Sequence, residues 1–242
     1  MTGSVGLEGI ERRLEDVRER VARSCERSGR SADGVEIVAI TKGHPDEALR
    51  AVARTGLVHV GENRVGEAEG KLERLGRLGL CWHMVGHLQR NKAAGAVRTF
   101  DELESLDSMR LARKLQAELE AAGREELPVL VQVNTSGEEA KGGFEAGGPD
   151  QASEAVDAIA RVCELSRLRV RGLMTMAPLT EDDAWVRRTF AAARSLFERC
   201  GREVPGFEPA ALSMGMSNDF EIAVEEGSTR LRLGTCLVGE RP

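Results

Sequence analysis

One lysine lies where a nucleophilic amine would be useful. Lys42 directly follows the β-branched run VEIVAIT at 35–41, and Gly43-His44-Pro45 then ends the buried strand that this run predicts. Only five of the 34 basic residues are lysines, and arginine cannot take a lysine's place in a Schiff base. Burial at a strand end lowers the pKa of a lysine and frees its amine to attack a carbonyl. A lysine that simply extends into water is the alternative interpretation.

Small and hydroxyl-bearing residues gather in two segments near the end of the chain. Residues 212–219, LSMGMSND, follow a predicted strand and begin a helix, where free backbone N–H groups bind anions. Residues 230–235, RLRLGT, form a further strand and its end. The loops after the last two strands of a β/α barrel commonly bind phosphate. The two segments therefore predict a phosphate site, with capping of the helix by Asp219 as the alternative role of the first.

Eight candidate strands alternate with helices along the chain. The strands are expected at 35–41, 58–62, 82–85, 100–106, 129–134, 170–176, 211–214 and 231–234. The helices are expected at 7–29, 46–55, 64–77, 89–96, 108–123, 151–166, 182–200 and 218–226. This alternation predicts parallel strands in an α/β fold, a single (β/α)8 TIM barrel with an extra N-terminal helix. We expect one domain over residues 1–242, and the glycine-rich segment 136–150 is expected to be a loop inside it.

An open, doubly wound sheet is the alternative architecture. This alternative is retained because Glu102, Glu104 and Asp107 interrupt the apolar pattern of the fourth predicted strand. In a closed barrel the first and eighth strands are neighbours, so Lys42 would face the phosphate segments. A Schiff-base lysine beside a phosphate site suggests a phosphorylated aldehyde, and pyridoxal 5′-phosphate (PLP) is the obvious one. A Schiff-base aldolase acting on a sugar phosphate would use the same parts. Asn63 ends the second strand beside Lys42 and is a candidate to hydrogen-bond a bound ring.

The histidines and cysteines do not predict a metal site. His83 and His87 are four residues apart, but their segment begins as a strand, so we expect no shared metal ion. His59 is expected to be a packed or hydrogen-bonded residue. The five cysteines are widely spaced and form no CxxC motif, which is typical of reduced thiols in a cytoplasmic protein.

Composition excludes several classes of partner. The net charge of -6 disfavours a general nucleic-acid binder. No run of about 18 apolar residues predicts a membrane span, and the charged stretch at 1–20 does not resemble a secretory signal. We therefore expect a monomer in the cytoplasm, with no membrane or nucleic-acid partner.

Six motifs of the chain resemble those of the PLP homeostasis protein family, also called YggS/PROSC. They run in order over nearly the whole chain, so the resemblance is specific. The motifs are VAITKGHP (38–45), VGENRVGEAEGK (60–71), WHMVGHLQRNK (82–92), VLVQVNTSGEEAKGG (129–143), RGLMTMAP (171–178) and LSMGMSNDFEIAVEEGSTRLRLGT (212–235). The chain departs from the family at Gly66, where glutamine is common, and at His87, where proline is frequent.

The resemblance implies a fold and a cofactor site. The fold is the fold-type III barrel of the N-terminal domain of alanine racemase, with PLP held as an internal aldimine, a Schiff base, on Lys42. The family pattern places Asn63 beside the cofactor ring and Arg232 near the pyridine nitrogen. It assigns the phosphate to Ser213, Gly215, Gly234 and Thr235.

The resemblance also implies a function in vitamin B6 homeostasis. The protein would carry and regulate intracellular PLP and release it to apo PLP-dependent enzymes, with little or no catalysis. The racemases that it resembles use the Schiff-base lysine and a tyrosine from a second domain, and this chain has no tyrosine. Arg232 offers only donors, so the ring nitrogen would stay unprotonated and withdraw electrons poorly. A weak single-domain amino-acid racemase is the alternative.

Overall fold

Eight parallel strands close into a barrel. The structure is a computed structural model that describes residues 6–138 and 141–241. Residues 139–140 of the predicted glycine-rich loop and the first five residues of the charged N-terminal stretch lie outside this description. The strands follow the order β4-β3-β2-β1-β9-β8-β7-β5, and a further pairing between β4 and β5 closes the ring. The predicted TIM barrel is therefore confirmed, and the open sheet is excluded.

The barrel strands match the eight predicted segments in number and order. Inside the segment expected to be a loop, the structure adds a short strand, β6, which pairs with the end of β5. The seventh and eighth predicted strands are therefore numbered β8 and β9. The strands are β1 (Glu36–Ile40), β2 (His59–Glu62), β3 (Cys81–Met84), β4 (Glu102–Leu106), β5 (Leu127–Asn134), β6 (Phe144–Glu145), β7 (Leu168–Met174), β8 (Ala211–Ser213) and β9 (Arg230–Leu233).

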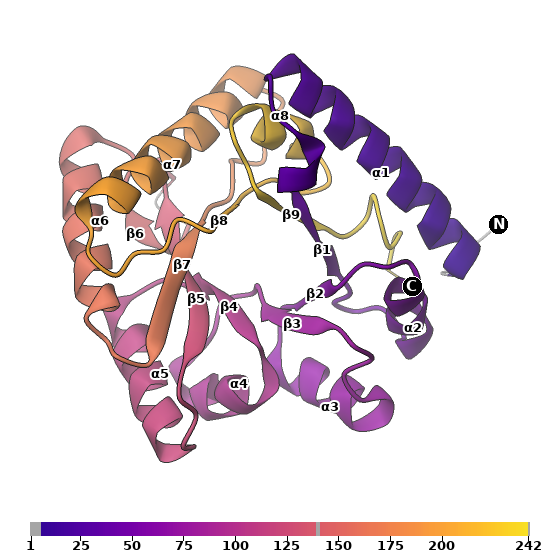
Figure 1. Ribbon diagram of the computed structural model, residues 1–242, viewed down its shortest axis with the longest axis horizontal. Helices are drawn as coiled ribbons and strands as arrows, with labels where there is room; N and C mark the ends of the chain where they lie inside the picture. Colours follow the sequence, from indigo (N-terminus) through magenta and orange to yellow (C-terminus); the bar gives the residue numbers. More distant parts are fainter. Residues whose placement is uncertain (1–5, 139–140, 242) are drawn as a thin grey trace.

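The helices lie around the outside of the strands (Figure 1). The α-helices are α1 (Leu7–Arg27), α2 (Asp46–Arg54), α3 (Val65–Leu75), α4 (Ala93–Thr99), α5 (Met109–Ala121), α6 (Pro149–Cys163), α7 (Asp183–Glu203) and α8 (Phe220–Glu225). Two 3-10 turns are η1 (Ala32–Gly34) and η2 (Arg90–Lys92). The segment predicted as a helix at 89–96 thus begins as a 3-10 turn, and α4 runs three residues further than expected.

The extra N-terminal helix packs on the barrel because one stripe of it is apolar. Ile10, Leu14, Val17 and Val21 recur at helical spacing and are all buried. Figure 1 shows α1 lying along α8, beside the part of the barrel formed by β1 and β9. The helix ends at Arg27, and Gly29 adopts a left-handed φ of 66° in the turn that follows.

The charged residues of β4 point into the barrel instead of breaking the strand. All five residues of β4 are buried, and Glu102 and Glu104 pair there with Arg230 of β9 and lie near His83 of β3. Buried carboxylates are tolerated where cations pair with them, so the weak strand signal at 100–106 reflects an ionic interior.

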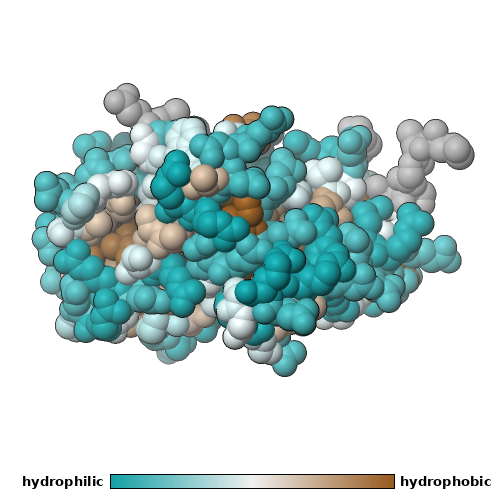
Figure 2. Space-filling model, turned by 90° about the horizontal axis from the view of Figure 1, so that it is seen from above, coloured by the Kyte–Doolittle hydropathy of each residue, from teal (hydrophilic) through white to brown (hydrophobic). Residues whose placement is uncertain are grey.

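The outer surface is mainly polar. Figure 2 shows a hydrophilic face on which hydrophobic residues occupy small patches between polar side chains. In the described part of the chain, no helix combines the length and the apolar character that crossing a bilayer requires.

Candidate functional site

Five of the seven predicted site residues surround one cavity at the carboxyl end of the barrel strands. The cavity holds about 340 Å³ and lies beyond β1, β2 and β9. Lys42 and Asn63 line it from the ends of β1 and β2, and Arg232, Gly234 and Thr235 line it from β9 and the turn after it. Because β1 and β9 are paired neighbours in the closed barrel, the lysine and the turn after β9 face the same space.

The amine of Lys42 is half-buried and has no ion-pair or hydrogen-bond partner among residues 6–138 and 141–241. Burial lowers the pKa of Lys42, and the positive charges of Arg241 and Arg232 lower it further against the opposing effect of Glu62. A larger fraction of the amine is therefore neutral and nucleophilic at a given pH than for an exposed lysine.

A buried ionic cluster fixes the backbone on both sides of Lys42. Lys71 of α3 donates to the carbonyl oxygen of Thr41 at 2.8 Å and to Glu62 Oε1 at 2.7 Å. The hydroxyl of Thr41 donates to the same Glu62 oxygen at 2.6 Å. Glu67 accepts from Lys71 and from the backbone N–H of Gly43. The residues before and after Lys42 are thus both tied to α3, which holds the lysine at the mouth of the barrel.

Arg232 is held from inside the barrel. Its guanidinium donates to Ser213 Oγ at 2.7 Å and to the carbonyl oxygen of Thr175 at 2.9 Å. Ser213 in turn donates to Glu104 Oε2 at 2.6 Å. Burial alone would raise the pKa of Glu104, but contacts with His83 and the charges of Arg230 and Arg232 hold it at about 2. Burial lowers the pKa of Arg232, and the negative charge of Glu104, which Ser213 links to it, opposes that shift.

Ser213 and Gly215 do not line the cavity. Ser213 is wholly buried, with its hydroxyl engaged by Arg232 and Glu104. Gly215 has a left-handed φ of 97°, and a side chain there would meet Ala223 and Leu231, so glycine is needed to turn the chain. The predicted contact of these two residues with a phosphate stays a prediction.

Four residues of two turns that line the cavity have backbone N–H groups without an acceptor in the described chain. They are Ser217 and Asn218, before α8, and Gly234 and Thr235, after β9. Ser217 Oγ accepts from the N–H of Cys236 at 3.2 Å and so links the two turns. Asp219 does not cap α8 and instead accepts from the N–H of Met216 at 2.6 Å. The lining of the cavity thus supplies unpaired backbone donors suited to an anion, in the same space as the amine of Lys42.

Sequence reasoning missed one cation of this cavity. Arg241 lines it and its charge acts on Lys42 and His44, but it follows the last element of the chain in a segment without a motif. Met176, two residues after the end of β7, also lines the cavity. Only the closed ring of strands brings these residues to Lys42, so no local signal could have identified them.

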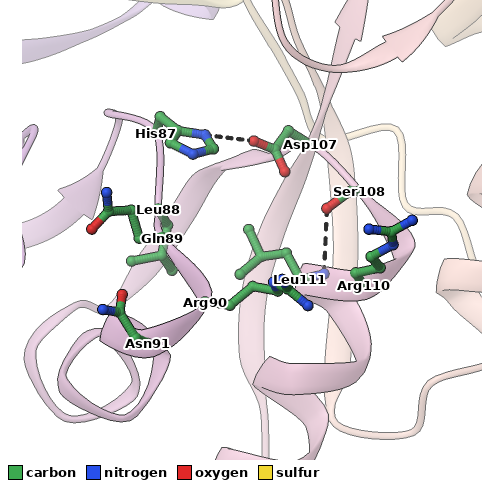
Figure 3. A pocket seen from close by; sticks show the side chains of 9 residues that line it. All are labelled: His87, Leu88, Gln89, Arg90, Asn91, Asp107, Ser108, Arg110 and Leu111. Carbon is green, nitrogen blue, oxygen red and sulfur yellow. Dashed lines mark hydrogen bonds and ion pairs between the residues drawn. The ribbon is translucent and has the colours of Figure 1, made fainter.

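A larger cavity, about 710 Å³, shares no lining residue with this one and contains none of the predicted site residues. Figure 3 shows His87 paired with Asp107 across it, at 2.8 Å, and Arg90 and Arg110 along its walls. His87 is exposed and His83 is buried inside the barrel, so these two histidines do not face each other. This cavity offers guanidinium groups and no amine of low pKa, so it does not compete with Lys42 as a Schiff-base site.

Comparison with known proteins identifies the family. The family model described as alanine racemase, N-terminal domain, matches residues 13–242. The pyridoxal phosphate homeostasis protein of Aquifex aeolicus is 40% identical over 95% of this chain and 97% of its own length. That of Escherichia coli K12 is 34% identical over 97% and 98%.

Solved structures agree with this assignment. PipY of Synechococcus elongatus with PLP bound has a TM-score of 0.81 at 33% identity, covering 95% of this chain and 100% of PipY. The alanine racemase of Corynebacterium glutamicum shares only the fold, with a TM-score of 0.67 at 17% identity over 98% of this chain and 62% of the racemase. The chain has the alanine racemase N-terminal barrel and belongs to the pyridoxal phosphate homeostasis protein family.

Proposed function

We propose that this protein binds PLP as a Schiff base on Lys42 and carries it for release to other proteins, with little or no turnover. One observation carries the proposal: within the described chain, the half-buried amine of Lys42 has no partner, and four residues whose backbone N–H groups lack an acceptor line the same cavity. An aldehyde that bears a phosphate fits both features. The names of the relatives and the PLP bound to PipY support the same ligand.

The residues around the cavity divide into those suited to the phosphate and those suited to the ring. Gly234 and Thr235 would donate to the phosphate, together with the backbone of Ser217. Asn63 would lie beside the ring, and Arg232 would face the pyridine nitrogen with a proton that it does not release. PLP supplies an electrophilic aldehyde, and the protein supplies the amine, the anion site and shelter from other amines. Ser213 would act through Arg232, which it holds in place.

The rest of the proposal concerns the protein as a whole. One domain over residues 1–242 acts as a monomer in the cytoplasm and passes PLP to apo PLP-dependent enzymes. The cysteines are free thiols in the described structure, which suits a reducing compartment. The mixture of charges with a net of -6 gives no basic footprint for nucleic acid.

The test is retention of PLP. The protein is loaded with PLP, passed through a desalting column and examined by visible absorption, beside Lys42→Ala and the control Lys92→Ala, which alters an exposed lysine that does not line the Lys42 cavity. We expect wild type and Lys92→Ala to keep an equal absorption band and Lys42→Ala to lose it. An equal band in Lys42→Ala, with its circular dichroism unchanged, would show that PLP binds elsewhere.

A further inference from the structure

Three potential metal ligands meet at the opposite, amino-terminal end of the barrel. His59 begins β2, Cys81 begins β3 and His83 follows two residues later on the same face of β3. His59 and Cys81 are direct partners in the pairing of the two strands. The ligand atoms of the three side chains all lie within 4.8 Å of one another. A barrel interior is usually filled by branched apolar side chains, so a thiol and two imidazoles here need a reason.

The geometry is close to that of a zinc site. The distance from His59 Nδ1 to His83 Nε2 is 2.9 Å, and the rings meet edge to face at 75°. Zinc bonds of about 2.0 Å to nitrogen and about 2.3 Å to sulfur space the ligands of a tetrahedral site roughly 3.3–3.7 Å apart. Small rotations of three side chains on rigid strands therefore suffice to enclose an ion.

The surroundings of His83 match those of a metal ligand. Its Nε2 faces His59, and its other ring nitrogen, Nδ1, lies 2.9 Å from Glu104 Oε1 at an angle too poor for a good hydrogen bond. A carboxylate behind a ligand histidine fixes the ring and makes it a stronger base. Glu102 lies 3.9 Å from the same nitrogen. Zinc bound by one thiolate and two neutral imidazoles carries one net positive charge, which these carboxylates offset.

Solvent access to the three side chains and the type of ligand that they offer also suit zinc. His59 and Cys81 are only partly buried, so an ion can enter from solvent, whereas His83 is fully buried. A thiolate with imidazoles selects zinc over magnesium or calcium, which prefer oxygen ligands. We propose that His59, Cys81 and His83 bind one zinc ion, with water as the fourth ligand, and so tie β2 to β3. The sequence analysis expects no metal on the evidence of His83 and His87, and it could not reveal this site, since His59 and Cys81 lie 22 residues apart and only strand pairing joins them.

The test uses PLP-loaded protein, stripped of metal with a chelator under reducing conditions and then given zinc chloride. Bound zinc is counted by mass spectrometry after desalting, and its Kd is measured by competition with a chromophoric chelator. We expect one zinc per chain in wild type. His59→Ala and Cys81→Ser should each raise Kd at least about tenfold. The matched controls Cys163→Ser and His87→Ala alter a half-buried thiol and an exposed histidine elsewhere and should bind as wild type.

X-ray absorption at the zinc edge of wild-type protein gives a second readout that needs no variant. We expect one sulfur neighbour at about 2.3 Å and two imidazoles at about 2.0 Å. Because the site is at the other end of the strands from Lys42, the PLP absorption of both ligand variants should be unchanged. Substoichiometric zinc in wild type, a shell without sulfur, or wild-type affinity in Cys81→Ser would each overturn the proposal.

Discussion

At the scale of the residue, Lys42 and Lys71 show how different surroundings give two lysines different roles. Lys71 is buried and bonded to two carboxylates and a carbonyl, so its charge is stabilised. Lys42 has no such partner, and burial together with Arg241 disfavours its charged form. Only one of these two amines is therefore ready to act as a nucleophile.

The lowered pKa of Lys42 gives a pH dependence with a definite sign. Only the neutral amine attacks an aldehyde, so the association rate should rise with pH around a midpoint below 10.5, the ordinary value for lysine. Arg241→Ala removes a positive neighbour and should move the midpoint upward. Stopped-flow absorption with pyridoxal, which lacks the phosphate, measures this without disturbing the anion contacts, and a free lysine derivative is the reference. A wild-type midpoint at or above that of the reference would contradict the account.

Two hydroxyls should behave differently when removed. Thr235 lines the cavity, so Thr235→Val should remove one hydrogen bond to the charged phosphate. The loss of binding free energy should be about 1.5–3 kcal/mol, which raises the Kd for PLP tenfold or more. Ser213 is bonded to Arg232 and Glu104 inside the barrel. Ser213→Ala should lower the free energy of unfolding by about 1–3 kcal/mol and weaken PLP less than Thr235→Val does. PLP titration and urea denaturation of both variants separate the two effects, and an intact affinity in Thr235→Val would place the phosphate elsewhere.

At the scale of the element, the end of β1 is held by α3. Lys71→Met leaves the buried carboxylate of Glu62 without its cation and should lower the free energy of unfolding by about 3–5 kcal/mol. The double variant with Glu62→Gln should recover much of this loss, because no buried charge remains unpaired. Lys114→Met, which breaks a partly exposed pair with Glu118, should change stability by about 0–1 kcal/mol. Urea denaturation measures all three, and equal losses in Lys71→Met and Lys114→Met would argue against the cluster.

The same scale shows what sequence can predict. Runs such as 35–41 are rich in apolar, β-branched residues, so their strands were predicted within a residue or two. The fourth strand was doubtful because Glu102 and Glu104 break its apolar pattern. Their partner Arg230 lies more than a hundred residues along the chain, and only barrel closure explains why they are buried. For the same reason, the sequence indicated Lys42 and the turn after β9 but could not reveal that Ser213 lies behind Arg232.

At the scale of the whole molecule, the closed barrel brings further side chains to the cavity beside Lys42. The described chain provides His44 and Asp219 as further proton acceptors at the cavity. Burial lowers the pKa of His44 and raises that of Asp219, and Asp219 is already bonded to the backbone of Met216. The motifs of the chain assign neither His44 nor Asp219 the role of the second base that racemisation needs beside Lys42.

Turnover of free amino acids should therefore be negligible. With L-alanine in deuterated water, exchange at Cα reports proton removal from one face, and D-alanine reports a second base. We expect neither signal above a Lys42→Ala blank. Either signal at enzyme-like rates, on the order of 1 s⁻¹ or faster, would favour the racemase, and loss of D-alanine formation alone in His44→Ala would identify His44 as the second base.

The central claim is the bond between PLP and Lys42, and borohydride reduction tests it most directly. Reduction converts a Schiff base into a stable secondary amine, so peptide mass mapping of the reduced protein shows which lysine carried PLP. We predict one pyridoxyl group per chain, on the peptide that contains Lys42, and none on Lys71 or Lys92. A pyridoxyl group on another lysine, or none after saturation with PLP, would contradict the account.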